Sequence, residues 1–442
     1  MAQRLFGTDG VRGVAGEKLT ADLALALGRA ATEQIGAPRG DVKRVLVIRD
    51  TRESGEMLEA ALSAGIASAG GDVFLGGVLP TPAAPLLLRA RGYDMAAVIS
   101  ASHNPYRDNG IKFFGADGYK LSDATEEAIE ARLDAPPAPA PRIGRIERVR
   151  GMDGEYVSAL AERFADLHLE GTKVLLDCAN GATYLVAPAI FRRLGAEVTV
   201  LHAEPDGRNI NDGCGSTHID ALAAPMREGG HDIGFAFDGD GDRVLAVDRN
   251  GVVVDGDELI ALAALHLREE GRLPGGGVAV TVMTNYGFHT AMRDAGIEVA
   301  TTPVGDRYVL EELRRRDWAL GGEQSGHIID LAFNRSGDGI AAALLTLEAL
   351  DGADLAQRTA MERLPQRLVN VPVEDRDATM ASEALAEAVA RENAALSGRG
   401  RVLVRPSGTE QLVRVMVEAP TDAEAEDACA RLVDVVQAAS TA

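Results

Sequence analysis

The chain has 442 residues, with 67 acidic against 45 basic side chains and a formal charge of −22. A chain this acidic is a poor candidate for a general binder of nucleic acids or anionic membranes, because its net field repels them. Hydrophobic residues make up 46% and charged residues 25%, which is globular composition and excludes wholesale disorder. An anionic ligand would need a local concentration of basic groups.

Neither a membrane span nor a secretory leader is visible in the sequence. No apolar stretch approaches the ~20 residues of a spanning helix, and the opening MAQRLFGTDGVRG lacks the apolar core of a signal peptide. Cys178, Cys214 and Cys429 are far apart and odd in number, which excludes a disulfide framework and a zinc site with paired-cysteine spacing. We expect a cytoplasmic protein without membrane or nucleic-acid partners.

Apolar strand-like runs alternate with alanine-rich helical stretches along the chain, which predicts α/β units with buried strands. The pattern repeats three times, with first strands opening at positions 44, 173 and 278, second strands near 70, 195 and 296, and third strands near 94, 232 and 317. Each third strand leads into a polar loop: SASHNP (100–105), DGDGDR (238–243) and GEQSGH (322–327). Because open α/β sheets bind ligands at strand ends, we expect one cleft lined by three related units.

Linker-like segments divide the chain into four predicted domains. The proline-rich segment 134–142, the glycine-rich segment 271–277 and the segment 364–375 interrupt the pattern, and a turn signal lies at 250–251. The last part combines two strands around a loop with helical stretches, which predicts a smaller α+β domain. The predicted limits are 1–142, 143–251, 252–368 and 369–442.

The DGDGDR loop is the predicted metal site. Asp238, Asp240 and Asp242 repel one another unless a cation or nearby basic groups compensate, and hard oxygen ligands on a glycine-spaced loop suit Mg²⁺. An EF-hand is excluded, because Arg243 stands where a glycine is needed and Arg249 where a bidentate glutamate is needed. Arg243 could contact an adjacent phosphate. The alternative is a solvated acidic turn.

The SASHNP loop offers a serine nucleophile or phosphate carrier. Spacing alone does not choose between Ser100 and Ser102, and the alternative is an ordinary turn that ends at Pro105. A Ser-His-Asp hydrolase is disfavoured, because the GxSxG elbow is absent and His103 is adjacent to Ser102. Downstream, we expect Lys112 in a partly dry cleft to have a lowered pKa and to exchange protons with a sugar hydroxyl; the alternative is an exposed lysine on an edge strand.

The remaining loops carry groups suited to a phosphorylated sugar. Glu323 and Ser325 can contact vicinal hydroxyls, and His327 can shuttle a proton near neutral pH. Arg12, in the glycine-rich GTDGVRG, can brace the cleft. The RPSGTE loop combines a guanidinium, hydroxyls and backbone amides in a phosphate nest, with a further arginine on the next strand: Arg405, Ser407, Gly408, Thr409 and Arg414. Each of these segments alone could be an ordinary turn.

Taken in order, GTDGVRG, SASHNP, DGDGDR, GEQSGH and RPSGTE resemble the motifs of the α-D-phosphohexomutase superfamily, over essentially the whole chain. The opening GTDGVRG together with NINDGCGSTH and GGEQSGH look most like the bacterial phosphoglucosamine mutase branch. The phosphomannomutase/phosphoglucomutase branch typically has another opening and Met where Gln324 stands. One departure is Gln411, where the family often has Pro, outside the expected contacts.

The resemblance implies three related α/β domains and a smaller TATA-box-binding-protein-like domain around a central cleft. It implies that Ser102, rather than Ser100, is phosphorylated, and that glucosamine 6-phosphate and glucosamine 1-phosphate interconvert through glucosamine 1,6-bisphosphate, for UDP-N-acetylglucosamine and cell-wall precursor synthesis. The implied residues are Mg²⁺ ligands at Ser102, Asp238, Asp240 and Asp242, catalytic groups at Ser102, Lys112, Arg243 and His327, and substrate contacts at Arg12, Glu323, Ser325, Arg405, Ser407, Gly408, Thr409 and Arg414.

Three alternatives stay open. The enzyme could prefer mannose or glucose phosphates, it could be a Mg²⁺-dependent sugar phosphatase, or it could be a phosphosugar-binding or calcium-binding module without activity. Intact Ser102 and Lys112 disfavour a degenerate binder, and the failed EF-hand spacing disfavours calcium. The expected partner is a small phosphosugar, and a homodimer is compatible with the sequence.

Overall fold

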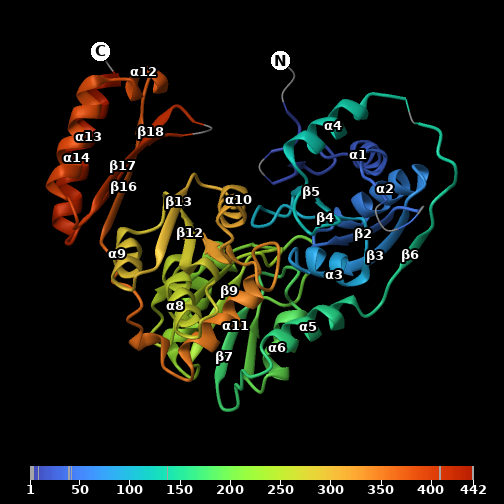
Figure 1. Cartoon of the computed structure of the whole chain (residues 1–442), viewed down its shortest axis with the longest axis horizontal. Helices are drawn as coiled ribbons and strands as arrows, with labels where there is room; N and C mark the ends of the chain where they lie inside the picture. Colours follow the sequence, from blue (N-terminus) through green and yellow to red (C-terminus); the bar gives the residue numbers. More distant parts are fainter. Residues whose placement is uncertain are drawn as a thin grey trace. The chain divides into compact units, whose positions relative to one another are not determined.

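The computed structural model describes residues 4–7, 9–37, 40, 42–136, 138–407 and 410–440. The chain divides into two compact units, Met1–Val282 with Ala300–Arg358, and Met283–Val299 with Thr359–Ala442. Figure 1 shows the succession of strands and helices along the chain. In the described part, no helix is both long enough and apolar enough to cross a membrane.

The first sheet has six strands in the order β1-β5-β4-β2-β3-β6. β5 is antiparallel to β1 and to β4, while β2 is parallel to both β3 and β4, so the sheet is mixed. The strands are β1 (Val11–Val14), β2 (Arg44–Arg49), β3 (Asp72–Val78), β4 (Met95–Ile99), β5 (Asp108–Gly115) and β6 (Ile146–Arg148), and the helices are α1 (Ala21–Gln34), α2 (Gly55–Ser68), α3 (Ala83–Arg91) and α4 (Asp123–Leu133).

Small residues let the first two helices pack closely on this sheet. The Thr20 side chain accepts a hydrogen bond from the Leu23 amide and starts α1, which satisfies one of the free amides at the helix end. A Cβ on Gly65 would lie 2.0 Å from the Leu25 carbonyl oxygen, and one on Gly28 would lie 2.3 Å from the Leu62 carbonyl oxygen. The close approach of α1 and α2 therefore requires glycine at both positions.

Two further mixed sheets complete the first unit. The second has the order β11-β10-β9-β7-β8 and the third β13-β12-β14-β15. Their elements are α5 (Met152–Arg163), β7 (Lys173–Asp177), α6 (Val186–Arg193), β8 (Glu197–Leu201), α7 (Asp220–Glu228), β9 (Ile233–Phe237), β10 (Val244–Asp248), β11 (Val253–Val254), α8 (Gly256–Glu269), β12 (Gly277–Thr281), β13 (Glu298–Thr302), α10 (Asp306–Arg316), β14 (Leu320–Gly322), β15 (Ile328–Asp330) and α11 (Gly339–Leu350).

The second unit is the smaller α+β part. Its antiparallel sheet has the order β16-β18-β17, and alternate residues of β18, Val413, Val415 and Val417, are buried against the helices. The elements are α9 (Tyr286–Asp294), β16 (Gln366–Pro372), α12 (Arg376–Met380), α13 (Glu383–Ala395), β17 (Arg401–Pro406), β18 (Leu412–Glu418) and α14 (Asp422–Ser440). Buried Glu418 accepts hydrogen bonds from the Tyr286 amide and from Arg401 Nε at 2.8 and 2.7 Å.

The predicted repeat is confirmed. The nine predicted strands are β2, β3, β4, β7, β8, β9, β12, β13 and β14, and the three polar loops follow β4, β9 and β14. The fold class, three α/β units with mixed sheets and a smaller α+β part, is likewise confirmed. The four domain limits stay a prediction; β6 lies beyond position 142 and pairs with β3 of the first sheet.

Candidate functional site

The loop after β4 separates the roles of its two serines. Ser102 Oγ donates to Asp238 Oδ2 at 2.6 Å, so this hydroxyl faces the acidic loop after β9. Ser100 Oγ donates to Asp50 Oδ2 at 2.6 Å and accepts a bond from the Ser102 amide at 2.9 Å. Ser102 has a φ of 54°, a left-handed conformation that non-glycine residues rarely adopt. The strained backbone at Ser102 is thus supported by Ser100, which sits behind it.

Two residues that sequence reasoning missed hold the same loop. Arg52 Nη2 donates to the carbonyl oxygens of Ser102 and Asn104 at 2.9 and 2.8 Å, and its side chain is completely buried. Asn211 Nδ2 donates to the same two carbonyls at 2.9 and 3.1 Å. Four donated bonds from two distant segments fix the loop. Arg52 comes soon after β2. A charged residue at the end of a predicted strand is a candidate site residue in α/β folds, so the sequence did offer a signal for Arg52.

The three aspartates after β9 form one buried cluster. Each offers an oxygen within 4.8 Å of the others, and all three are at most 7% exposed. Burial, and then the charges of Asp242 and Asp240, raise the pKa of Asp238 well above its usual range. Asp240 Oδ1 and Asp242 Oδ1 are buried without a hydrogen-bond partner. Hard oxygens, two of them unpartnered, fit a divalent cation such as Mg²⁺.

Glycine lets this acidic loop meet the serine loop. A Cβ on Gly239 would lie 2.6 Å from the Ser102 carbonyl oxygen, and Gly241 has a φ of +71°. A side chain at position 239 would therefore push the two loops apart. The alternation of aspartate and glycine thus combines three carboxylates with a close backbone contact in one loop.

Lys112 differs from the expectation for it. It lies on β5, between β1 and β4, and is 1% exposed, so it is not a lysine on an edge strand. Its Nζ lies 2.9 Å from Asp240 Oδ2 and 2.8 Å from Asp9 Oδ2. Burial alone lowers the pKa of Lys112, but the charges of these two carboxylates exceed that effect and raise it. The predicted lowered pKa is therefore wrong.

The ion pairs continue into a ring of alternating charges, which Lys112 Nζ closes at 4.0 Å from Asp242 Oδ2. Lys120 Nζ lies 2.5 Å from Asp9 Oδ1 and 2.6 Å from Asp306 Oδ2. His327 Nε2 lies 3.9 Å from Asp306 Oδ2, and His327 Nδ1 lies 3.7 Å from Asp242 Oδ1. Burial acts to lower the pKa of His327, but the charges of Asp242 and Asp306 raise it overall. The ring joins groups from all three sheets of the first unit.

Three members of this ring, Asp9, Lys120 and Asp306, were missed by sequence reasoning. Asp9 is part of the motif GTDGVRG, so the sequence did offer a signal for it. Asp306 follows Gly305 at the start of α10, beyond β13, which is a ligand position in α/β folds. Lys120 lies between β5 and α4 and gives no signal of its own. Its role depends on partners 111 and 186 residues away.

The other predicted residues of the first unit surround the ring or approach it. The Arg12 guanidinium donates to Asp9. Arg243 Nε lies 3.9 Å from Asp242 Oδ1 and is buried with no hydrogen-bond partner. Glu323 Oε1 accepts from the Gly305 amide at 2.9 Å, while Ser325 is exposed. The loops 100–105, 238–243 and 322–327 thus meet at one place, as the repeat predicts, with two guanidinium groups beside them.

The predicted phosphate loop lies in the second unit. Arg405 on β17 stands directly opposite Arg414 on β18, and burial followed by the Arg414 charge lowers the pKa of Arg405. Arg414 Nε is buried without a hydrogen-bond partner. The Ser407 carbonyl accepts from Arg376 Nη1 at 2.6 Å. Gly408 and Thr409 lie outside the described residues. Two like charges side by side favour an anion between them.

Comparisons with known proteins cover the whole chain. Four models described as phosphoglucomutase/phosphomannomutase match: α/β/α domain I at residues 3–138, domain II at 154–251, domain III at 255–370 and the C-terminal domain at 368–435. Phosphoglucosamine mutase of Moorella thermoacetica is 54% identical over 437 residues, covering 97% of this chain and 98% of its own. That of Mycolicibacterium paratuberculosis is 50% identical over 442 residues, covering 99% of each.

Solved structures agree in fold. A phosphoglucomutase/phosphomannomutase family protein from Burkholderia thailandensis superposes with a TM-score of 0.83 at 25% identity, covering 99% of this chain and 98% of its own. N-acetylphosphoglucosamine mutase of Aspergillus fumigatus, solved with GlcNAc-6P and magnesium, superposes with a TM-score of 0.71 at 18% identity. The match covers 99% of this chain and 96% of its own. The predicted resemblance is confirmed. The chain belongs to the phosphoglucomutase/phosphomannomutase family, within its phosphoglucosamine mutase group.

Proposed function

We propose that this enzyme interconverts glucosamine 6-phosphate and glucosamine 1-phosphate, with Ser102 as the phosphoryl carrier. One observation carries the proposal: the Ser102 hydroxyl lies 2.6 Å from Asp238, inside a buried acidic cluster next to Lys112 and Arg243. A carrier serine needs neutralising charge on both sides of the phosphoryl group. Relatives 50–54% identical to this chain carry the name phosphoglucosamine mutase, which supports the choice of sugar.

The proposed reaction runs in two transfers. The bond between phosphorus and Ser102 Oγ breaks while a bond forms to the free sugar hydroxyl, whose proton passes to a neighbouring base, and glucosamine 1,6-bisphosphate results. After the bisphosphate reorients, its other phosphate returns to Ser102 and the sugar oxygen recovers a proton. Of the two predicted proton carriers beside the cluster, His327 is the candidate base, and charged Lys112 can return the proton that the sugar oxygen recovers. The ion pairs of Lys112 favour its charged form, which suits it to neutralising the transferred group.

Asp238, Asp240 and Asp242 would hold Mg²⁺, together with an oxygen of phosphorylated Ser102. When bound, the cation would neutralise the phosphoserine and the charge that develops during transfer. Two buried carboxylate oxygens of the cluster, Asp240 Oδ1 and Asp242 Oδ1, accept no hydrogen bond from the described residues, which supports this assignment. Arg243, with its buried and unpartnered Nε, would contact the same phosphate.

The remaining groups would bind the substrate. Glu323 and Ser325 would contact sugar hydroxyls, and Arg12 would orient the cleft-side phosphate. The second unit would hold the phosphate that does not react, through Arg405, Ser407, Gly408, Thr409 and Arg414. Three free cysteines, all buried, favour a reducing compartment, which supports our proposal of a cytoplasmic reaction. Light scattering would show whether the protein forms the homodimer with which the sequence is compatible.

Intact mass spectrometry with peptide mapping tests the carrier. The protein is incubated with glucosamine 1,6-bisphosphate, and we expect one added phosphate on the peptide that contains Ser102. Ser102→Ala should gain none, whereas Ser100→Ala, the matched control from the same loop, should still be labelled. Label on another residue, or none on any, would overturn the assignment. Release of inorganic phosphate without a bisphosphate requirement would favour the phosphatase, and rates on glucosamine, mannose and glucose phosphates decide the sugar.

A further inference from the structure

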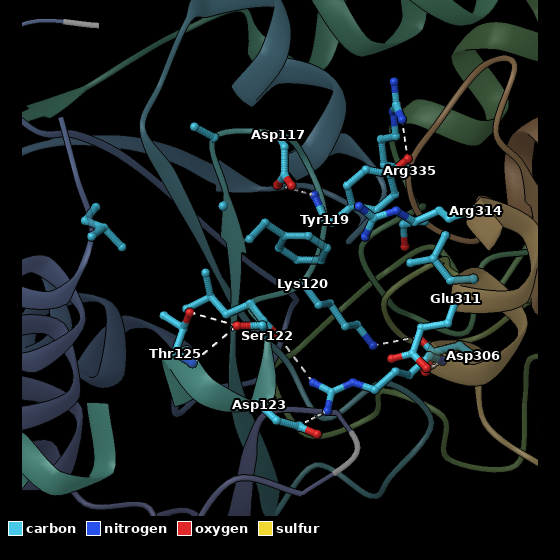
Figure 2. Close-up of a pocket in the computed structure, with 18 of the residues that line it drawn as sticks. Asp117, Tyr119, Lys120, Ser122, Asp123, Thr125, Asp306, Glu311, Arg314 and Arg335 are labelled. Atoms are coloured by element: carbon cyan, nitrogen blue, oxygen red, sulfur yellow. Dashed lines mark hydrogen bonds and ion pairs between the residues drawn. The ribbon is translucent and has the colours of Figure 1, made fainter. Parts of the chain in front are cut away.

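A cavity lies beside the candidate site, within the first unit. It has a volume of about 910 Å³ and is bounded by the end of α1, the segment between β5 and α4, and α10 (Figure 2). His327 lies on its wall, so the cavity adjoins the charged ring. A cavity of this volume is at the upper end of the range for small-molecule sites. It is therefore larger than a monosaccharide phosphate needs.

Two of the basic residues on the wall already have acidic partners. Lys120 is paired with Asp306 at 2.6 Å, as the dashed line in Figure 2 shows. Arg307 is paired with Asp123 and lies 3.3 Å from a Glu126 oxygen. The charges of Lys120 and Arg307 are therefore neutralised by carboxylates of the protein itself. Other basic residues at the cavity differ from these two in their partners.

Arg314 and Arg335 have no such carboxylate. No ion pair joins either of them to an acidic group in the described part of the chain. Figure 2 shows both gathered around Tyr119, with the Arg314 Cζ 4.1 Å and the Arg335 Cζ 4.9 Å from the ring centroid. The Arg335 guanidinium donates to the Tyr119 hydroxyl, but its Nε is buried without a hydrogen-bond partner. The Tyr119 side chain itself is 8% exposed, so a buried ring anchors the two guanidinium groups.

A third guanidinium completes the group. A Cβ built on Gly118 would lie 3.0 Å from Arg89 Cδ and 3.3 Å from Arg335 Cγ, so both stems pass over this glycine. Arg89 lines an adjoining cavity, which shares the wall residues Ala116 and Asp117 with the cavity of Figure 2. It too lacks an ion pair within the described residues. Three arginines without an ion-paired carboxylate among the described residues thus lie around the Gly118–Tyr119 turn, and an anion that reached them would gain charge-assisted hydrogen bonds.

We propose that this cavity binds a small molecule with a diphosphate group, of the class of nucleoside diphosphates. Guanidinium groups bind phosphate oxygens in pairs, and three of them match more than one phosphate. Apolar side chains of Ile35, Leu310 and Ile329 line the same cavity and suit an uncharged part of the ligand. The proposal stands apart from the proposed reaction, whose substrates carry single phosphate esters. A ligand here would bridge the elements that carry Lys120 and Asp306, next to His327.

Calorimetric titration of the full-length protein with ADP tests this site. We expect ADP to bind the wild type, and Arg314→Ala and Arg89→Ala each to weaken it at least tenfold. Both side chains are on the surface of their helices, so the folded state is not at risk. Arg315→Ala is the matched control: this neighbour is exposed, carries the same charge and is paired with Glu312, so its loss should change ADP affinity less than twofold.

Two further arms separate the site from the candidate active site. Arg405→Ala should leave ADP affinity unchanged, because that residue belongs to the proposed substrate site and not to this cavity. AMP should bind at least tenfold more weakly than ADP. The proposal is overturned if the wild type binds no ADP at millimolar concentration, if Arg314→Ala weakens binding no more than Arg315→Ala, if only Arg405→Ala abolishes it, or if AMP equals ADP. All of these readouts are independent of whether the mutase activity is found.

Discussion

The serine–aspartate region of the first unit and the Arg405–Arg414 strand pair of the second unit satisfy their charges in opposite ways. In the first, each cation lies against carboxylates, as Lys112 does with Asp240 and Asp9, and the ring closes on itself. In the second, two guanidinium groups stand opposite one another on paired strands. Opposite charges stabilise a site without a ligand, whereas two like charges repel each other until an anionic ligand binds.

The comparison teaches that substitutions should act differently in the two regions. Removing one partner of a buried ion pair leaves an uncompensated charge and costs stability as well as activity. Removing one of two like charges costs ligand binding alone. Four experiments, given in order of decreasing expected effect, test this distinction.

Ser102→Ala should have the largest effect. Loss of the carrier oxygen should lower turnover by at least about three orders of magnitude, because the covalent step has no substitute. Stability should change little, since Ser102 Oγ makes polar contacts only with Asp238, at 2.6 Å, and with the neighbouring His103 Nδ1, at 3.2 Å, among the described residues. Turnover is measured by coupled assay and folding by thermal denaturation. Ser100→Ala should keep measurable turnover but destabilise the fold, because this hydroxyl joins Asp50 to the Ser102 amide. Normal turnover in Ser102→Ala would sink the carrier assignment.

Asp240→Asn should combine a loss of stability with a loss of cation binding. The substitution removes a partner of fully buried Lys112, for which about 3–5 kcal/mol of unfolding free energy is expected. Urea denaturation measures the loss of unfolding free energy, and a Mg²⁺ titration of activity measures the loss of cation binding. Combining Asp240→Asn with Lys112→Met should recover part of the stability but none of the activity. Unchanged cation affinity in Asp240→Asn would show that the acidic cluster is not the metal site.

Arg405→Ala should weaken substrate binding by about 2–3 kcal/mol, the range for a charge-assisted hydrogen bond, and leave stability unchanged. The measurement is KM for the sugar phosphate beside the unfolding midpoint. Arg401→Ala is the matched control on the same strand, because Arg401 pairs with buried Glu418 at 2.7 Å. That variant should lose stability while KM stays the same. If the two variants behave alike, the second unit does not separate ligand binding from folding as we infer.

A pH dependence of the second unit should be the smallest effect. Burial, followed by the charge of Arg401, lowers the pKa of His289 to about 4, against 6.5 in the unfolded chain. Because the folded pKa is depressed, the unfolded state binds the proton first. The stability from neutral His289 is complete above pH 6.5 and is lost as the pH falls towards 4, by about 2 kcal/mol between pH 7 and 5. Denaturation of the wild type and His289→Gln at both pH values checks this, and equal slopes would refute it.

The sequence by itself determined the order of the elements and the position of the three polar loops. Strand runs, alanine-rich helices and glycine-led turns are written in short-range periodicity, so β4, β9 and β14 could be predicted together with the loops that follow them. The Asp-Gly alternation at 238–242 likewise predicted a metal site, whereas the close backbone contact at Gly239 came only from the structure. The same reasoning left Ser100 and Ser102 equivalent, because spacing does not say which hydroxyl faces the acidic loop.

Only the tertiary structure decided the charge state and partners of the site. Lys112 was expected to lose its proton readily, yet its pKa is raised by two carboxylates that lie 103 and 128 residues away along the chain. Lys120 and Asp306 gave little or no local signal and still close the ring. An ion pair depends on the distance between side chains in space, while periodicity reports only the local backbone and which face is buried. The loops could therefore be located from the sequence, but their electrostatics could be known only once the three sheets were assembled.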